Sequence, residues 1–143
     1  MIKKLVVSGL VVALMMGCTT SVPISSKNAI PVPKNRALAF QDSTGERSIP
    51  ITVTRDAGII GSACYLEFWI DGTKAALFDA GETTQFFVAP GVHIGEVNWD
   101  QQGRGLCGLI NAPTNAEINA KEGRKSSYRL LTITDTVLIL PSY

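Results

Sequence analysis

The sequence predicts an all-β protein, a small antiparallel β-sandwich, and three observations support this fold class. Apolar and polar residues alternate over short stretches such as residues 49–55, which is the period of a half-buried strand. The turn-forming pairs Asp71-Gly72 and Pro90-Gly91 separate these stretches. No long stretch repeats its apolar residues at helical spacing. We therefore expect a single sandwich domain over residues 37–143.

The expected strands follow one another along this domain, each a short apolar or alternating run between turn residues. Residues 121–125 (KEGRK) predict a turn between two of them, and residues 115–122 are ambiguous because they could also form a short helix. The predicted strands are 49–55, 63–70, 74–78, 83–88, 92–99, 116–120, 128–134 and 136–140.

A cleavable leader is expected before the domain. Two lysines precede an apolar run, residues 5–16, that is shorter than the about 20 residues needed to span a bilayer. The run ends at Gly17, a small residue, and Cys18 follows at once. These features predict a secretory signal peptide over residues 1–17.

The junction Leu14-Met15-Met16-Gly17-Cys18 resembles the lipobox of bacterial lipoproteins. This resemblance implies that the thiol of Cys18 carries diacylglycerol, that the leader is cut just before Cys18, and that the new amine is acylated too. Leucine is preferred where Met15 stands, and this departure is mild because methionine is also apolar and unbranched at Cβ. An ordinary signal peptide with an incidental cysteine is the alternative.

The residue after the cysteine bears on the destination. In Gram-negative lipoproteins an aspartate there commonly retains the protein in the inner membrane, whereas this chain has Thr19. The resemblance therefore implies a lipid anchor in the outer membrane, with the domain facing the periplasm. The membrane is then a partner through the N-terminal lipid, since two or three acyl chains anchor a protein firmly.

The stretch after Cys18 is rich in serine, threonine, asparagine and proline and lacks a hydrophobic period. Proline-rich segments favour extended backbone. We therefore expect residues 18–36 to be the lipidated cysteine and a flexible tether that holds the domain off the lipid surface.

Charge excludes some partners. The chain has 13 basic and 12 acidic residues, and two of the basic residues leave with the leader. A nearly neutral chain without a block of like charges offers no electrostatic footprint for nucleic acid. We expect no nucleic-acid partner, no cofactor and no metal, because two cysteines and one distant histidine do not make a structural zinc site.

Cys64 and Cys107 remain once Cys18 carries lipid. An exported domain meets an oxidising compartment, where two cysteines commonly pair. They are 43 positions apart, so a disulfide would stabilise the fold by about 4 kcal/mol in the chain-entropy model. The alternative is two buried, unpaired thiols.

A second resemblance covers roughly residues 49–134. The strand that ends in DG (71–72), the PGVH turn (90–93) and the later hairpin with Gly123 and Tyr128 are similar to small envelope β-domains of the PEGA-like group. The tetrapeptide that names the group is absent, and residues 107–115 have no counterpart. The resemblance implies an accessory or binding module.

The histidine and the glutamates that could perform catalysis are not placed in the sequence as a catalytic site requires. His93 is the only histidine and would have to serve any Ser–His or Cys–His centre, but its place after a Pro-Gly turn favours a local structural role. Glu67, Glu82 and Glu96 could cleave a sugar bond as a pair, yet their spacing brings no two together. We therefore predict no catalytic residues and no enzyme.

Three aromatic residues are candidate binding residues. Tyr65 and Trp69 fall on the strand face opposite Leu66, Phe68 and Ile70, and Trp99 ends a later strand. Exposed rings beside a carboxylate suit sugar stacking or a protein partner. A strand that is buried on both faces is the alternative.

These observations predict a non-enzymatic outer-membrane lipoprotein that acts as an accessory, structural or protein-binding component of the envelope. One alternative is a module that binds peptidoglycan or polysaccharide through the three aromatic residues. Another is an inhibitor or immunity-type lipoprotein, which size and anchoring permit although no residue argues for it.

Overall fold

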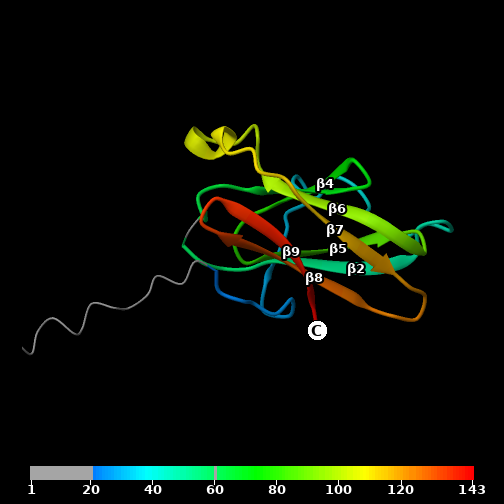
Figure 1. The fold of residues 1–143 in the computed structure, drawn as a ribbon. Coiled ribbons are helices and arrows are strands. Elements are labelled where there is room, and N and C mark those ends of the chain that lie inside the picture. Colours follow the sequence, from blue (N-terminus) through cyan, green and yellow to red (C-terminus); the bar gives the residue numbers. More distant parts are fainter. Residues whose placement is uncertain (1–20, 60) are drawn as a thin grey trace, which may run out of the picture.

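The computed structural model describes residues 21–59 and 61–143, which form two β-sheets that face each other (Figure 1). The all-β sandwich prediction is confirmed, because this part of the chain consists of strands, turns and one short 3-10 helix. The strands are β1 (Ile30–Pro31), β2 (Ile49–Arg55), β3 (Leu66–Ile70), β4 (Thr73–Phe78), β5 (Glu82–Val88), β6 (Gly91–Trp99), β7 (Thr114–Ala120), β8 (Ser126–Ile133) and β9 (Thr136–Ser142), and the helix is η2 (Gly105–Leu109).

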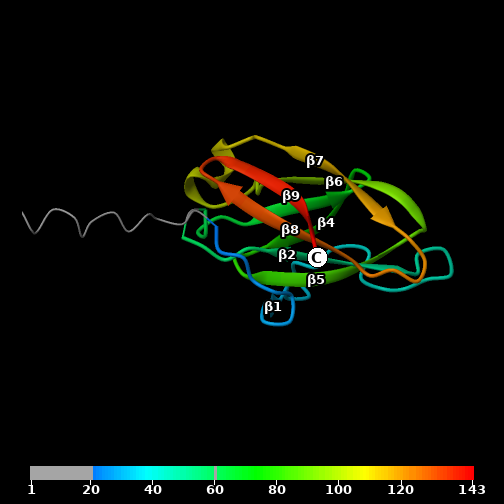
Figure 2. The same ribbon diagram turned by 60° about the horizontal axis from the view of Figure 1, so that its bottom comes forward.

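The larger sheet has the strand order β1-β5-β2-β8-β9, and the smaller sheet has the order β4-β3-β6-β7. Figure 2 shows β1 beside β5 at the margin of the larger sheet. Most neighbours are antiparallel, as predicted, but β2 runs parallel to β8 and β1 runs parallel to β5. Alternation of apolar residues does not reveal these parallel pairs, because their partners are far apart in the sequence.

The space between the sheets is filled by the inward-facing residues of both. Phe68, Phe78 and Phe86 are fully buried, and their ring centroids lie 5.6 to 6.4 Å apart in tilted and edge-to-face arrangements. In β2, Ile51 and Val53 face the same core, as the alternating pattern predicts. This contiguous apolar core is the principal driving force for the fold.

The ambiguous stretch before the 121–125 turn is a strand. β7 pairs with β6 from Gly91↔Ala120 to Val97↔Thr114, so the helix alternative for residues 115–122 is wrong. Ile118 and Ala120 are buried while the residues between and beside them are exposed, which is the period of two that a sheet requires. Tertiary pairing decides the structure here, because alanine and glutamate also favour helix.

The Asp71-Gly72 pair makes the predicted two-residue hairpin turn between β3 and β4. Both residues have positive φ angles, 48° and 78°. A turn of this kind matches the twist of the flanking strands, and aspartate and glycine tolerate its left-handed backbone. The predicted pairing of this hairpin is therefore confirmed.

Residues 22–40 lie along the sandwich, which differs from the flexible tether that composition predicts. Val22 bridges to Ala57, β1 pairs with β5, and Ala37 bridges to Ala76 on β4. These contacts cover backbone groups at the margins of both sheets, which would otherwise be open edges. Prolines interrupt the pairing but permit these short contacts, so a proline-rich composition does not distinguish this segment from a tether. Residues 18–20 of the predicted tether lie outside the described residues.

Candidate functional site at the disulfide-linked end

The predicted disulfide is confirmed. Cys64 and Cys107 are bonded with their Cα atoms 5.5 Å apart, which is an ordinary separation for a disulfide. The bond joins the loop of residues 56–64 to the loop of residues 100–113. These two loops and the β8–β9 turn form one end of the sandwich, which we call the disulfide end.

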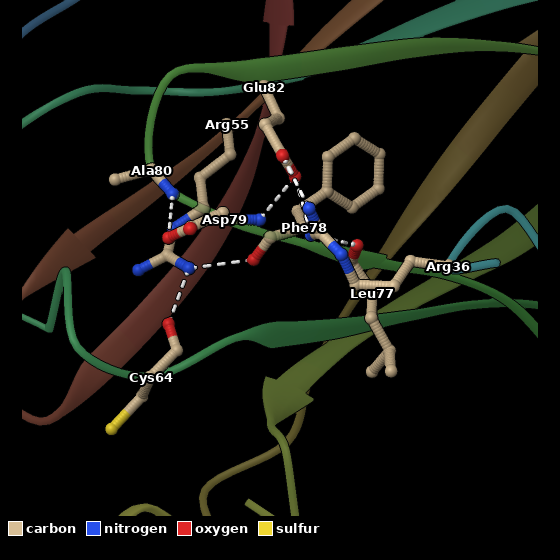
Figure 3. Close-up of polar contacts among 8 residues, drawn as sticks. All are labelled: Arg36, Arg55, Cys64, Leu77, Phe78, Asp79, Ala80 and Glu82. Carbon is tan, nitrogen blue, oxygen red and sulfur yellow. Dashed lines mark hydrogen bonds and ion pairs between the residues drawn. The ribbon is translucent and has the colours of Figure 1, made fainter. Parts of the chain in front are cut away.

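A buried arginine holds the first of these loops. Arg55 ends β2 and is only 2% exposed. Its Nη1 donates to the carbonyl oxygens of Cys64 and Phe78 at 2.7 and 2.8 Å (Figure 3). Its Nη2 donates to the carbonyl oxygen of Gly61 at 2.8 Å. The strand predicted from residue 63 therefore starts only at Leu66, because the residues before it turn around the guanidinium.

Burial is the main influence on the charge of Arg55. It lowers the pKa of Arg55 to about 10, and the negative charges of Asp79 and Glu82 act against it. The guanidinium is thus charged at neutral pH. Buried charge of this kind is tolerated because hydrogen-bond acceptors surround it.

A second arginine fastens the N-terminal segment beside this site. Arg36 makes two parallel bonds to Glu82, Nη1 to Oε2 at 2.7 Å and Nη2 to Oε1 at 2.6 Å (Figure 3). The hydrogen bond to Glu82 raises the pKa of Arg36 further above its ordinary value. Glu82 Oε2 also accepts the backbone N–H of Asp79 at 2.6 Å, which orients the carboxylate.

The second loop is held in place by side-chain hydrogen bonds to its backbone. Asn98 Oδ1 accepts the N–H of Ala112 at 3.1 Å, and Gln101 Nε2 donates to the carbonyl of Ile110 at 2.7 Å. A Cβ atom on Gly103 would lie 2.7 Å from the Cβ atom of Cys107, so the chain is tightly coiled there. This loop, GRGLCGLI in the sequence, is therefore an ordered element.

The disulfide end presents apolar side chains to the solvent. Ile59 is 84% exposed, and Leu106 and Leu109 on η2 are 76% and 77% exposed. A shallow pocket of about 170 Å³ lies beside the disulfide between the two loops. Exposed leucines on a loop closed by a disulfide are unusual enough to indicate a contact surface.

The three predicted binding aromatics do not form a shared surface. Trp99 is 1% exposed and its Nε1 donates to the carbonyl of Asp135 at 2.8 Å, so its prediction as a binding residue is wrong. Trp99 faces inward because it shares the face of Val97 on β6, opposite Leu66. It supports the disulfide end from within.

Tyr65 and Trp69 are partly buried, and each faces a cation. The guanidinium carbon of Arg36 lies 4.5 Å from the Tyr65 ring centroid, and Nζ of Lys74 lies 5.0 Å from that of Trp69. The indole Nε1 of Trp69 is buried without an acceptor in the described structure. Trp69 lies on the outer side of the smaller sheet, on the face opposite Phe68, as the alternation predicts, whereas Tyr65 precedes β3.

The glutamates that could in principle act as an acid–base pair have separate roles. Glu82 binds Arg36, whereas Glu67 is 4% exposed and lies 2.6 Å from Nζ of Lys74. Glu96 is on the same outer face as Glu67, and in the pairing of β3 with β6 it lies opposite Trp69. The ion pair compensates the buried charge of Glu67.

His93 lies at the opposite end of the sandwich. Its Nδ1 is 2.6 Å from Asp71 Oδ2 and its Nε2 is 2.8 Å from the carbonyl of Ala89, so both ring nitrogens face acceptors. Burial lowers the pKa of His93, but these hydrogen bonds and the charge of Asp71 outweigh it, and the net pKa is raised. The pKa of Asp71 is lowered, because the bonds from His93 and from the N–H of Ile94 outweigh burial.

Comparison with family models, with curated proteins and with solved structures finds no match to this chain. The described residues contain no group of three or more histidine, cysteine or acidic side chains placed to hold a metal ion. In the same residues no helix has the length and apolarity needed to cross a bilayer. The predicted leader and the predicted lipobox at Cys18 lie outside the described residues, and the PEGA-like resemblance stays a prediction.

Sequence reasoning missed the two arginines and the exposed leucines. Arg55 ends an ordinary alternating strand, and Arg36 stands in a segment of tether-like composition, so neither carries a local signal. Leu106 and Leu109 do carry a local signal, because they are apolar residues in a glycine-rich stretch beside a cysteine, outside any predicted strand. That signal indicates exposure only once the loop is known to lie outside the core.

Proposed function

We propose that this chain is a lipid-anchored protein of the bacterial outer membrane whose β-sandwich serves as a non-enzymatic accessory or protein-binding component of the envelope. The leader and the lipobox sequence at Cys18 support the anchor. The disulfide between Cys64 and Cys107 supports export, because such bonds persist in oxidising compartments.

The observation on which the non-enzymatic reading rests is the state of the sole histidine. A general base must present one ring nitrogen to the group it deprotonates. In His93, Nδ1 faces Asp71 and Nε2 faces the carbonyl of Ala89, so both nitrogens are used within the fold. Cys64 and Cys107, the two cysteines of the sandwich domain, are bonded to each other and are not free nucleophiles.

The surface that suits a protein partner is the outer face of β6 and β7, away from the disulfide end. Val92 and Ile94 are 58% and 48% exposed there, opposite the polar residues Asn119 and Glu117 of β7. Apolar side chains within a polar surround are typical of a protein contact. Because His93 and its turn fix the start of β6, this face is well ordered.

Mass spectrometry of the mature protein tests the anchor. We expect an N-terminal Cys18 that carries diacylglycerol and an amide-linked acyl chain, and a Cys18→Ser variant that leaves the membrane fraction. An unmodified Cys18 in the native protein would contradict the proposal.

Site-specific photocrosslinking in cells tests the protein partner. A photoreactive residue at Ile94 should give a discrete protein adduct, whereas the same residue at Gln85 should not, because Gln85 is exposed on the other sheet. Equal labelling at both positions would count against a specific partner. The identity of the adduct would also reveal an inhibitor or immunity-type role, since that partner would be a toxin or a phage component.

Glycan binding is the weaker candidate. Trp99 is buried, and Tyr65 and Trp69 each face a cation in place of open solvent. A change in tryptophan fluorescence on addition of muropeptides that is lost in Trp69→Ala would support glycan binding.

A further inference from the structure

We propose that the disulfide end of the sandwich lies against the membrane that holds Cys18 and inserts Leu106 and Leu109 into the boundary between headgroups and acyl chains. This inference rests on the proposed lipid anchor. It adds a second membrane contact, made by the folded domain itself.

The first step is the distance from the anchor to the fold. Val22 is fixed to Ala57 by two backbone hydrogen bonds, N–H to O at 2.6 and 2.8 Å. Val22 is the fourth residue after Cys18, and a fully extended chain advances at most about 3.6 Å per residue. An acylated Cys18 would therefore hold Val22 within about 14 Å of the lipid anchor, and its bridge partner Ala57 within about 20 Å.

The second step is the position of the exposed leucines relative to Ala57. Ala57 begins the loop that carries Ile59 and Cys64, and the disulfide joins Cys64 to Cys107, which lies on η2 between Leu106 and Leu109. Figures 1 and 2 show η2, the β8–β9 turn and the start of the described chain at the same end of the molecule. The most exposed leucines thus lie at the end that the anchor would draw to the membrane.

The third step is the chemistry of that end. The flanking Arg104 is exposed and can meet lipid phosphates. Asp100 is buried, and its Oδ1 accepts the N–H of Gln102 at 3.1 Å. Asp135 is the exposed carboxylate of this end, and its Oδ1 accepts the hydroxyl of Thr134 at 3.1 Å.

The occupant follows from the position of the surface. Leu106, Leu109 and Ile59 are exposed on two loops at the end that the anchor would draw to the bilayer, so lipid is the nearest surface that they can meet. A lipid boundary requires no complementary surface, and a few buried apolar side chains add usefully to an acyl anchor. The disulfide and the hydrogen bonds of Gln101 keep the loop ordered, so insertion costs little conformational entropy.

Quenching by brominated lipids tests the inference on the full, lipidated protein. Leu106→Trp places an indole at the proposed contact, and Val92→Trp places one at a comparably exposed apolar position near the opposite end. Both variants are reconstituted in vesicles of phosphatidylethanolamine and phosphatidylglycerol with brominated acyl chains. We expect the emission of Leu106→Trp to shift to the blue and to lose intensity, while Val92→Trp keeps the emission it has in unbrominated vesicles.

The possible failures are distinguishable. If mass spectrometry shows that Cys18 is not acylated and the protein does not float with vesicles, the proposed function and this inference both fall. If the protein is acylated and floats but Leu106→Trp is not quenched, only the inference is overturned. A protein adduct from a photoreactive residue at Leu109, without lipid quenching at Leu106→Trp, would likewise assign this end to a protein partner and overturn it.

Discussion

The disulfide between Cys64 and Cys107 closes a segment of 43 residues, and its removal gives a measurable loss of stability. In the chain-entropy model, a crosslink over this separation reduces the entropy of the unfolded chain enough to stabilise the fold by about 4 kcal/mol. For a domain of this size, that corresponds to a fall of about 15 °C in the midpoint of thermal unfolding. We expect this change when both cysteines are replaced by alanine.

The assay compares the double variant Cys64→Ala, Cys107→Ala with its parent by circular dichroism during thermal and urea unfolding. Both proteins carry Cys18→Ser, so that a third thiol cannot exchange with the disulfide. Reduction of the parent should give the same midpoint as the double variant. A loss below about 1 kcal/mol would refute the reasoning, because the crosslink would then not restrict the unfolded chain as the model requires.

Three further predictions concern the buried arginine, the histidine pair and a close backbone contact. Arg55→Met should lower the free energy of unfolding by about 3 kcal/mol in urea denaturation, because one buried and two partly buried carbonyls lose their donor, and an unchanged midpoint would contradict this. His93→Gln should destabilise the protein more at pH 5 than at pH 8, because the pKa of His93 is higher in the folded than in the unfolded protein. The protonated histidine therefore stabilises the fold fully below its unfolded pKa of 6.5, and this stabilisation is lost as the pH rises through the folded pKa. The pKa of Asp71 is lowered in the folded protein, so its stabilisation of the fold is fully present above pH 3.8 and is lost only in stronger acid. Equal destabilisation by His93→Gln at pH 5 and pH 8 would exclude the ion pair. Gly95→Ala should cost about 1–3 kcal/mol, since its Cβ would lie 2.6 Å from the buried isoleucine of β7, whereas Gly45→Ala, with open space around it, should be neutral in the same assay.

Local sequence patterns predict the strands and their inward faces well. The alternation in β2 and the Asp71-Gly72 turn depend on neighbours in the chain, and both are found as expected. The parallel pairing of β2 with β8 is not predictable in this way, because it brings together residues such as Val53 and Tyr128. Such contacts are selected by the whole fold and leave no local periodicity.

The candidate site was predicted only in part, for the same reason. Two cysteines in a domain that is expected to be exported predict a disulfide from composition and compartment alone, and Cys64 and Cys107 are indeed bonded. The burial of Trp99 depends on the strand face that it shares with Val97, and the role of Arg36 depends on a segment that folds back onto β4 and β5. Neither can be read from the residues that flank them.

The place of β2 in the larger sheet has a consequence for how the protein acquires its structure. This strand lies between β5 and β8, and its pairing with β8 involves residues 126–130 of the 143-residue chain. The edge of β2 that pairs with β8 thus has no partner until nearly all of the polypeptide is available to fold. Such late, long-range closure makes folding slow, so a chaperone that shields the waiting strand should raise the yield of native protein, and a chain cut before residue 126 should aggregate.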